Sequence, residues 1–266
     1  MSWVYRRLTS RWRGLPQVYI AGVKKGGTTS LFHYLLKHPR VLSPFRKEVK
    51  FYLYMYNHQS VRWYRANFPW ASQLQQGYLT VDATPNYAYH PRFVEQVQAV
   101  APDAKIILLL RNPVQRTLSH YFQNRQRNLE PLPLEEALKA EEERLSEEKR
   151  RLLEDPCYIS WRYHRFGYLA ESRYIEYVRP VVENIPSDQL LILRSEDMFH
   201  NPAGVLQQVA DFLGLESWTF EPKVYKAGRY QLQQEHNSVV AWLYSYFRPY
   251  NQRLYELLGR DMGWDA

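Results

Sequence analysis

The sequence predicts an α/β fold, with a single domain built on a central parallel sheet that is flanked by helices. Three observations support this prediction. Short apolar runs with strand-like composition alternate along the chain with segments of helical periodicity. Residues 105–110 are almost continuously apolar, as expected for a strand that is buried on both faces. A length of 266 residues, of which 45% are hydrophobic, suits one large domain.

The expected elements follow in chain order. Strands are predicted over residues 18–23, 78–81, 105–110 and 189–193, and helices over residues 29–37, 92–100, 114–127, 168–182 and 202–213. Residues 134–154 are rich in glutamate, with basic residues three or four positions away, which predicts an exposed helix. The alternative is a mobile lid whose acidic face attracts a cationic substrate. Residues 239–258 predict a closing helix that is broken near Pro249.

Composition narrows the class of protein. The net charge of +8 favours an anionic cofactor or partner, but the basic residues are mixed with 27 acidic ones, so we expect no nucleic-acid partner. Cys157 is the only cysteine, which excludes an internal disulfide and predicts a packing residue. No apolar run approaches the roughly 20 residues that a membrane span needs, and residues 1–15 lack a signal-peptide core. We therefore expect a cytoplasmic protein.

Residues 17–31 contain the most informative pattern. A β-branched run breaks at Gly22 into Lys-Lys-Gly-Gly-Thr-Thr-Ser, and a helical pattern follows at once. A strand that turns through glycines into a helix N-terminus binds anions, phosphate above all. Thr28 occupies the position of the Walker A lysine, and Lys24 and Lys25 lie inside the loop instead. The pattern predicts a P-loop-like sheet edge; the alternative is a βα turn with solvated lysines.

A second anion site is predicted after the apolar run of residues 105–110. This strand ends in Arg111, where a magnesium-dependent phosphate enzyme usually has an aspartate. Asn112-Pro113 begins a helix that carries Ser119, eight residues beyond the arginine. Arg111 could instead pair with a buried acid. His33, His38, His58 and His120 lack metal-ligand spacing, so we expect packing or surface roles for them and no metal site.

These motifs together resemble those of sulfotransferases that use 3′-phosphoadenosine 5′-phosphosulfate (PAPS), especially the heparan-sulfate-type branch and its bacterial relatives. The resemblance covers about residues 17–260 and rests on Lys25-Gly26-Gly27-Thr28-Thr29, on Arg111 with Pro113 and Ser119, and on Lys47-Glu48-Val49-Lys50-Phe51-Tyr52. Gly26 stands where many relatives have a larger residue, and is expected to make the loop more flexible. The resemblance implies a basic N-terminal extension over residues 1–16 and a sulfotransferase domain over residues 17–266.

The resemblance also implies roles for individual residues. The donor would be bound by Lys25, Gly26, Gly27, Thr28, Thr29, Ser30, Arg111, Ser119, Tyr168, Gly228 and Arg229. Lys25 would stabilise the charge that grows on the oxygen between phosphate and sulfate, and no metal would be required. Glu48 would be the general base, and its neighbouring lysines should keep it ionised. Asp82 and His90 are rival bases.

The acceptor is the least defined part of the prediction. A hydroxyl or amine of a small natural product is expected, which would place the enzyme in secondary metabolism, with Lys50, Trp63, Tyr87, Tyr89 and Trp161 as candidate contacts. A guanidinium alkaloid would suit an acidic lid. The alternatives are a glycan sulfotransferase, a nucleotide kinase or NTPase, and an anion-binding module without turnover.

Overall fold

A computed structural model describes residues 2–218 and 234–265 of the chain. The chain packs as two compact units. Unit 1 comprises residues 1–110 and 184–226, and unit 2 comprises residues 111–183 and 227–266. Each unit is described by itself below.

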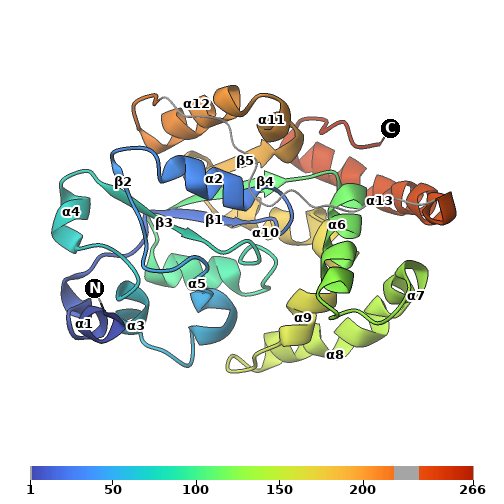
Figure 1. Ribbon diagram of the computed structural model, residues 1–266, viewed down its shortest axis with the longest axis horizontal. Coiled ribbons are helices and arrows are strands. Elements are labelled where there is room, and N and C mark those ends of the chain that lie inside the picture. Colours follow the sequence, from blue (N-terminus) through green and yellow to red (C-terminus); the bar gives the residue numbers. More distant parts are fainter. Residues whose placement is uncertain (1, 219–233, 266) are drawn as a thin grey trace. The chain divides into compact units, whose positions relative to one another are not determined.

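Unit 1 contains the sheet (Figure 1). Its five strands are all parallel and have the order β2-β3-β1-β4-β5. The strands are β1 (Val18–Gly22), β2 (Val41–Leu42), β3 (Leu79–Ala83), β4 (Lys105–Leu110) and β5 (Leu190–Arg194). This arrangement confirms the predicted α/β class and four predicted strands to within two residues. β2 was not predicted, because two residues are too few to show a strand pattern.

The helices of unit 1 cover both faces of this sheet. They are α1 (Trp3–Leu8), η1 (Ser10–Trp12), α2 (Thr28–Leu35), η2 (Phe51–Met55), α3 (Val61–Arg65), α4 (Ala71–Gln75), α5 (Phe93–Val100), η4 (Ser187–Gln189), α11 (Ser195–His200) and α12 (Pro202–Leu213). Val18 and Ile20 of β1 share one core with buried side chains of α2 and α12. Tyr19, which points to the opposite face, contacts Tyr52 of η2 instead. α5 lies on that opposite side (Figure 1).

Unit 2 is helical. Its elements are α6 (Pro113–Gln126), α7 (Leu134–Lys139), α8 (Glu141–Glu154), α9 (Trp161–Phe166), η3 (Ala170–Ser172), α10 (Ile175–Asn184, whose last residue is counted with unit 1), η5 (Gln234–His236) and α13 (Asn237–Leu258). Apolar residues of α6, α7 and α13 form one core with Tyr168 and Leu169. The α6 prediction is confirmed, since Asn112 caps the helix by accepting from Val114 N at 3.0 Å and Pro113 begins it.

Several unit 2 predictions were wrong in detail. Residues 134–154 form two helices, and the Glu141 side chain at their junction is buried. The helix expected from residue 168 begins at Ile175, because residues 170–172 form a 3₁₀ turn. α13 continues through Pro249, which lies on an exposed side where water can satisfy the unpaired carbonyl group. Cys157 is exposed and is not a packing residue.

The N-terminal residues are ordered as helix and not as loose chain. α1 and η1 occupy residues 3–12, and Arg6 donates hydrogen bonds to the carbonyl oxygens of Ala66 and Phe68, each at 2.6 Å. The division at residue 16 stays a prediction. Within residues 2–218 and 234–265, no helix combines the length and the apolar character required to cross a membrane.

Candidate functional site

The glycine-rich loop of unit 1 connects the buried strand β1 to α2. Two of its residues have left-handed backbone conformations, Lys25 with φ of 73° and Gly27 with φ of 91°. Gly27 is the N-cap of α2 and offers no side-chain acceptor to the first turn of the helix. The N–H groups of a first helical turn have no partner within the helix, and the positive end of the helix dipole adds to them. The loop therefore has the strand–turn–helix geometry that the sequence predicted, and its anion-binding role stays a prediction.

Gly26 is required by close packing against β4. A Cβ atom at this position would lie 2.4 Å from the carbonyl oxygen of Leu109. This oxygen belongs to the backbone of the sheet, so it could move only by distorting β4. The Gly26 N–H donates to Val23 O at 2.9 Å, and Val23 N–H donates to Leu109 O at 3.1 Å. The expected flexibility is therefore wrong for this chain, because Gly26 is buried and joins the loop to the sheet.

Ser195 also supports the loop, although no role was predicted for this residue. Its hydroxyl group, at the start of α11, donates to the carbonyl oxygen of Gly26 at 2.7 Å. The side chain is fully buried. A serine after a strand-end arginine was a visible pattern in the sequence, but only the fold brings residue 195 to residue 26.

Glu48 lies close to the first turn of α2. Its two carboxylate oxygens are each 3.7 Å from a lysine nitrogen, one from Lys47 and the other from Lys50. Lys47 Nζ also donates to Thr29 Oγ1 at 3.4 Å, which connects the group to the first turn of α2, directly after the glycine-rich loop. About a third of the Glu48 side chain is exposed (33%), so the carboxylate is accessible to a substrate. This position fits the predicted base, whose role itself stays a prediction.

Asp82 occupies a buried network of hydroxyl groups. Tyr64 and Tyr87 donate to its Oδ2 atom at 2.7 and 2.8 Å, and Thr84 donates to its Oδ1 atom at 2.8 Å. Burial raises the pKa of Asp82, while these three hydrogen bonds oppose the shift. The carboxylate is completely enclosed, so its position argues against Asp82 as a base that touches an acceptor.

The Asp82 network holds the segment that follows Glu48. The Tyr87 hydroxyl group accepts a hydrogen bond from Phe51 N–H at 2.9 Å, and Thr84 Oγ1 accepts one from Lys50 N–H at 3.4 Å. Lys50 has a left-handed backbone with φ of 60°. Asp82 orients the two hydroxyl groups, and these bind the backbone next to the candidate base. We therefore interpret Asp82 as a positioning residue.

The other candidates in unit 1 are largely enclosed. Burial lowers the pKa of His90 to about 4, so this imidazole is a weak base near neutral pH. Tyr87 and Tyr89 are buried, and Trp63 packs against Trp3 and Phe51. These positions remove part of the support for an aromatic acceptor site.

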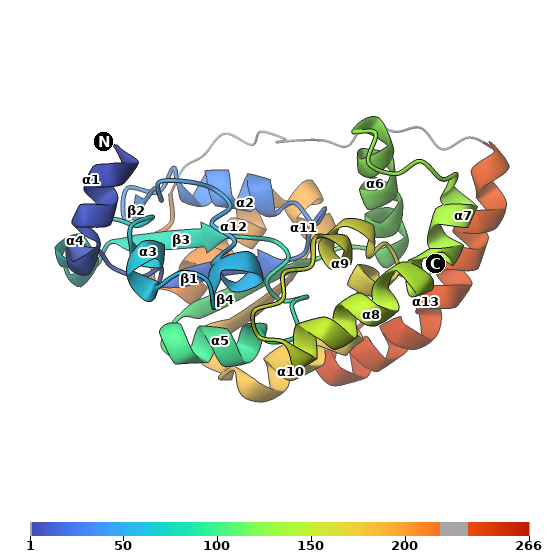
Figure 2. The ribbon, with the colours of Figure 1, turned by 90° about the horizontal axis from the view of Figure 1, so that it is seen from below.

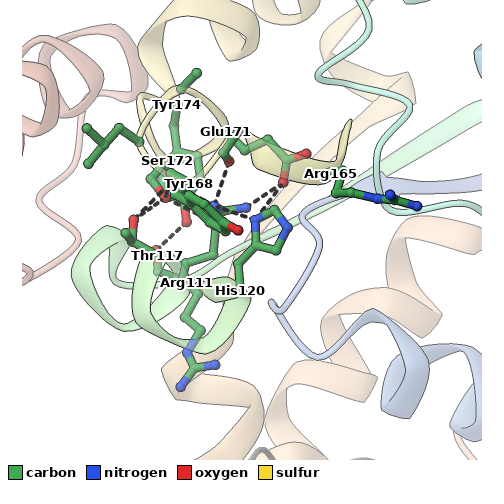
Figure 3. Close-up of polar contacts among 12 residues, drawn as sticks. Arg111, Thr117, His120, Arg165, Tyr168, Glu171, Ser172 and Tyr174 are labelled. Atoms are coloured by element: carbon green, nitrogen blue, oxygen red, sulfur yellow. Dashed lines mark hydrogen bonds and ion pairs between the residues drawn. The ribbon is translucent and has the colours of Figure 1, made fainter. Parts of the chain in front are cut away.

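Unit 2 carries the predicted second anion site, and Figure 3 shows its surroundings. The Arg111 side chain points away from the central group of polar contacts in this view, and its guanidinium group donates to Gln115 at 3.3 Å. The Arg111 carbonyl oxygen accepts from the Tyr174 hydroxyl group at 2.7 Å. Ser119 is buried on α6. Their phosphate-binding roles stay predictions.

A buried ion pair lies next to these residues on α6. Arg116 donates to Glu171 Oε2 at 2.6 Å, to Ser172 Oγ at 2.6 Å and to the Tyr168 carbonyl oxygen at 2.8 Å. His120 Nδ1 lies 3.7 Å from the same Glu171 oxygen (Figure 3). In the sequence, Arg116 and His120 are visible only as two residues four positions apart on a predicted helix. No role was predicted for Arg116.

Tyr168 serves the structure of unit 2. Its hydroxyl group donates to Glu130 Oε2 at 2.9 Å and accepts from Asn124 Nδ2 at 2.9 Å. The ring is fully buried. This gives the predicted donor contact no support. Trp161, by contrast, is exposed.

Part of the acidic segment is paired within residues 134–160. Arg150 pairs with both Glu147 and Glu154, each at 2.6 Å. Glu148 accepts from the hydroxyl groups of Tyr158 and Ser160 at 2.6 and 2.5 Å. This pairing weakens the case for an acidic face that attracts a cationic acceptor.

The predicted donor contacts of Gly228 and Arg229 cannot be compared with the structure, because both residues lie outside the described ones. In the part of the chain that the structure describes, no cluster of three or more histidine, cysteine, aspartate or glutamate side chains has the arrangement of a metal site.

Comparisons with known proteins agree with these motifs. The family model "Sulfotransferase domain" matches residues 15–238. The membrane-associated sulfotransferase kil1 of Dictyostelium discoideum is 29% identical over 94% of this chain and 66% of its own length. Mouse heparan sulfate glucosamine 3-O-sulfotransferase 3A1 is 29% identical over 95% of this chain and 65% of its own length. The chain thus spans just under two thirds of these relatives.

Solved structures share the fold. A sulfotransferase from Alicyclobacillus acidocaldarius superposes with a TM-score of 0.71 over 95% of this chain and 100% of its own, at 24% identity. At that identity the likeness concerns the fold alone. The family is shown by the sequence match, which covers most of the chain and includes the glycine-rich loop and Arg111. The chain therefore belongs to the sulfotransferase-domain family.

Proposed function

We propose that this chain transfers the sulfuryl group of PAPS to a hydroxyl group of an acceptor. The observation that carries the proposal is the connection of the Glu48 carboxylate through Lys47 to Thr29, in the first turn of α2 directly after the glycine-rich loop. A carboxylate that would accept a proton thus lies near the proposed anion site. Family membership supports PAPS as the donor, because this donor is general to the family.

In this proposal the loop binds the 5′-phosphosulfate. The N–H groups at the start of α2 and the hydroxyl groups of Thr28 and Thr29 would hold the phosphate. Lys25 would stabilise the negative charge that grows on the bridging oxygen as the sulfur–oxygen bond breaks. Arg111 and Ser119 keep their proposed role as ligands of the 3′-phosphate, on the strength of their motif.

The acceptor proton would pass to Glu48. As the acceptor oxygen forms its bond to sulfur, its proton moves to the carboxylate, and adenosine 3′,5′-bisphosphate leaves with the electrons of the broken bond. Lys47 and Lys50 flank the carboxylate, with each lysine nitrogen 3.7 Å from one of its oxygens. Asp82 contributes by orienting Thr84 and Tyr87, whose hydroxyl groups hold the backbone of residues 50 and 51.

We further propose an anionic acceptor, such as an acidic saccharide. Glu48 is the only acidic residue between positions 1 and 81, where 13 lysines and arginines occur, so the surroundings of the base favour negative charge. The mouse relative is named for 3-O-sulfation of heparan sulfate glucosamine, which is consistent with a sugar hydroxyl. A small natural product had rested on aromatic side chains, of which Tyr87 and Tyr89 are buried.

Ligand-dependent thermal stability and an acceptor panel test this function together. A ligand that binds only the folded state raises the melting temperature. Adenosine 3′,5′-bisphosphate should stabilise the protein without magnesium, and ATP with magnesium should not. Mass-detected sulfate transfer should then favour acidic oligosaccharides over neutral phenols and guanidinium compounds. Stabilisation by ATP alone would indicate a nucleotide kinase, and nucleotide binding without transfer to any acceptor would indicate a binding module.

A further inference from the structure

Unit 1 exposes an unusual number of large apolar side chains at one place. Ten large hydrophobic residues are exposed among those that the structure describes, and six of them lie on α1, η1, α3 and the adjoining residue 45: Val4, Tyr5, Leu8, Trp12, Phe45 and Val61. We call α1, η1, residues 45–46 and α3 the N-terminal surface. Leu8 is 74% exposed and Trp12 is 51% exposed. Isolated exposed apolar residues are ordinary, but a group of six calls for an explanation.

The N-terminal surface is a packed part of unit 1. The Trp3 ring stacks on Phe45 at 5.4 Å and contacts Trp63 edge-on at 5.9 Å. The Arg46 guanidinium group lies over the Trp3 ring at 4.6 Å. With the Arg6 hydrogen bonds to residues 66 and 68, these contacts fix α1 on α3. Figure 2 shows α1 at the margin of the picture, beside the N-terminus. The exposed apolar side chains therefore extend from a helix that is packed against the rest of unit 1.

Two of the exposed residues have the spacing of one helical side. Val4 and Leu8 are four residues apart on α1 and therefore lie on the same side of this helix, and Trp12 follows on η1. Arginines accompany them: Arg7 and Arg11 are exposed on the same segment, and Arg62 is exposed on α3. The Arg11 guanidinium group lies 3.8 Å from the Trp12 ring centroid.

The charge of this region is strongly one-sided. Residues 1–81 contain 13 lysines and arginines and one acidic residue, whereas the remaining chain contains 22 basic and 26 acidic residues. The even mixture expected from overall composition is therefore wrong, since the positive charge of the chain is concentrated in its N-terminal third. α1, η1 and α3 contain no acidic residue at all.

We propose that the N-terminal surface docks on an anionic lipid bilayer. Arginines beside exposed Leu, Tyr and Trp are the combination that binds at a membrane interface, where basic groups contact lipid phosphates and carboxylates and apolar side chains enter the acyl boundary. A soluble polyanion would use the arginines but would leave the apolar side chains in water. A second copy of this chain would bring the same arginines against one another without an acidic residue to pair them. Both therefore fit less well than a bilayer.

Vesicle co-sedimentation of the full chain tests this proposal. The protein should sediment with vesicles that contain phosphatidylserine in phosphatidylcholine, and not with phosphatidylcholine alone. The double variant Leu8→Gln/Trp12→Ala should lower the partition coefficient at least about tenfold. The double variant Arg7→Gln/Arg11→Gln should lower it by about twentyfold or more, from roughly a factor of five for each arginine.

Matched controls separate docking from general charge and folding. Leu153 and Arg253 are exposed residues of α8 and α13, and the double variant Leu153→Gln/Arg253→Gln should bind vesicles as the wild type does. Circular dichroism should show that every variant is folded. Equal vesicle binding by wild type and Leu8→Gln/Trp12→Ala would overturn the proposal in favour of a purely electrostatic surface. Self-association that this variant abolishes, without vesicle binding, would assign the surface to a second copy and also overturn it.

Discussion

The two units bury carboxylates in different ways. In unit 1, Asp82 is surrounded by neutral hydroxyl groups of two tyrosines and a threonine. In unit 2, Glu171 pairs with Arg116, and Glu130 accepts two hydrogen bonds from Arg144 at 2.7 and 3.2 Å. The hydroxyl groups around Asp82 also bind the backbone next to the candidate base, whereas the ion pairs join α6 to η3 and the loop at residue 130 to α8. A buried acid near a site can therefore orient that site without being the reacting group.

The largest expected effect is the loss of the charged partner in unit 2. Arg116→Met leaves the Glu171 carboxylate buried without its cation, which should lower the free energy of unfolding by about 3–5 kcal/mol. The double variant Arg116→Met/Glu171→Leu should recover part of that loss. Asp82→Asn, which removes a charge that has no cation, should cost only about 1–3 kcal/mol. Urea denaturation measures the free energy of unfolding of all three variants. An equal loss in Arg116→Met and Asp82→Asn would contradict the difference between the two units.

The next effect depends on pH and concerns Glu141 at the junction of α7 and α8. Burial raises the pKa of Glu141 from 4.5 to about 7, although its carboxylate accepts from the N–H groups of Leu169 and Ala170. The folded state holds this proton more tightly, so the stabilisation is complete below about pH 4.5 and is lost as the pH rises through 7. The shift corresponds to about 3 kcal/mol.

Glu141→Gln should abolish that dependence. The stability of this variant relative to wild type should rise by about 3 kcal/mol between acidic and mildly alkaline solution, measured by urea denaturation across that range. Other titrating groups are common to both proteins and cancel in the difference. The exposed Glu142→Gln on the same helix is the control, and an identical pH response in both variants would contradict the assignment.

A matched pair of tyrosine variants sharpens the description of unit 1. Tyr87→Phe removes a donor to Asp82 and leaves the buried Phe51 N–H without its acceptor, at a cost of about 1–3 kcal/mol. Tyr64→Phe removes a donor to the same carboxylate oxygen but touches no backbone group near Glu48. In a sulfate-transfer assay, Tyr87→Phe should lower kcat about tenfold and Tyr64→Phe should not. Equal losses of kcat would refute the positioning role of the network.

The smallest effect on stability is expected at Ser195. Ser195→Ala removes one buried hydrogen bond to the Gly26 carbonyl oxygen, which should cost about 1 kcal/mol. Because that bond holds the glycine-rich loop, binding of adenosine 3′,5′-bisphosphate should weaken several-fold, as measured by calorimetry. Unchanged affinity would show that packing of Gly26 against β4 is sufficient.

Local sequence patterns predicted the sheet and the loop. They failed for residues whose roles depend on partners that are distant in the sequence. The strands were readable because continuous apolar runs reflect burial on both faces, and the loop because glycines and a helix start are adjacent in sequence. Ser195 and Arg116 act on partners 169 and 55 residues away, so no local pattern could assign them. The break expected at Pro249 failed because its exposure to water makes a proline tolerable.

The most direct test of the central claim is the variant Glu48→Gln. It should be stabilised by adenosine 3′,5′-bisphosphate as the wild type is, because the loop that binds the nucleotide is unchanged. Its kcat for sulfate transfer should fall by at least about a hundredfold, since a general base contributes that much. Transfer at close to the wild-type rate would contradict the proposed role of Glu48.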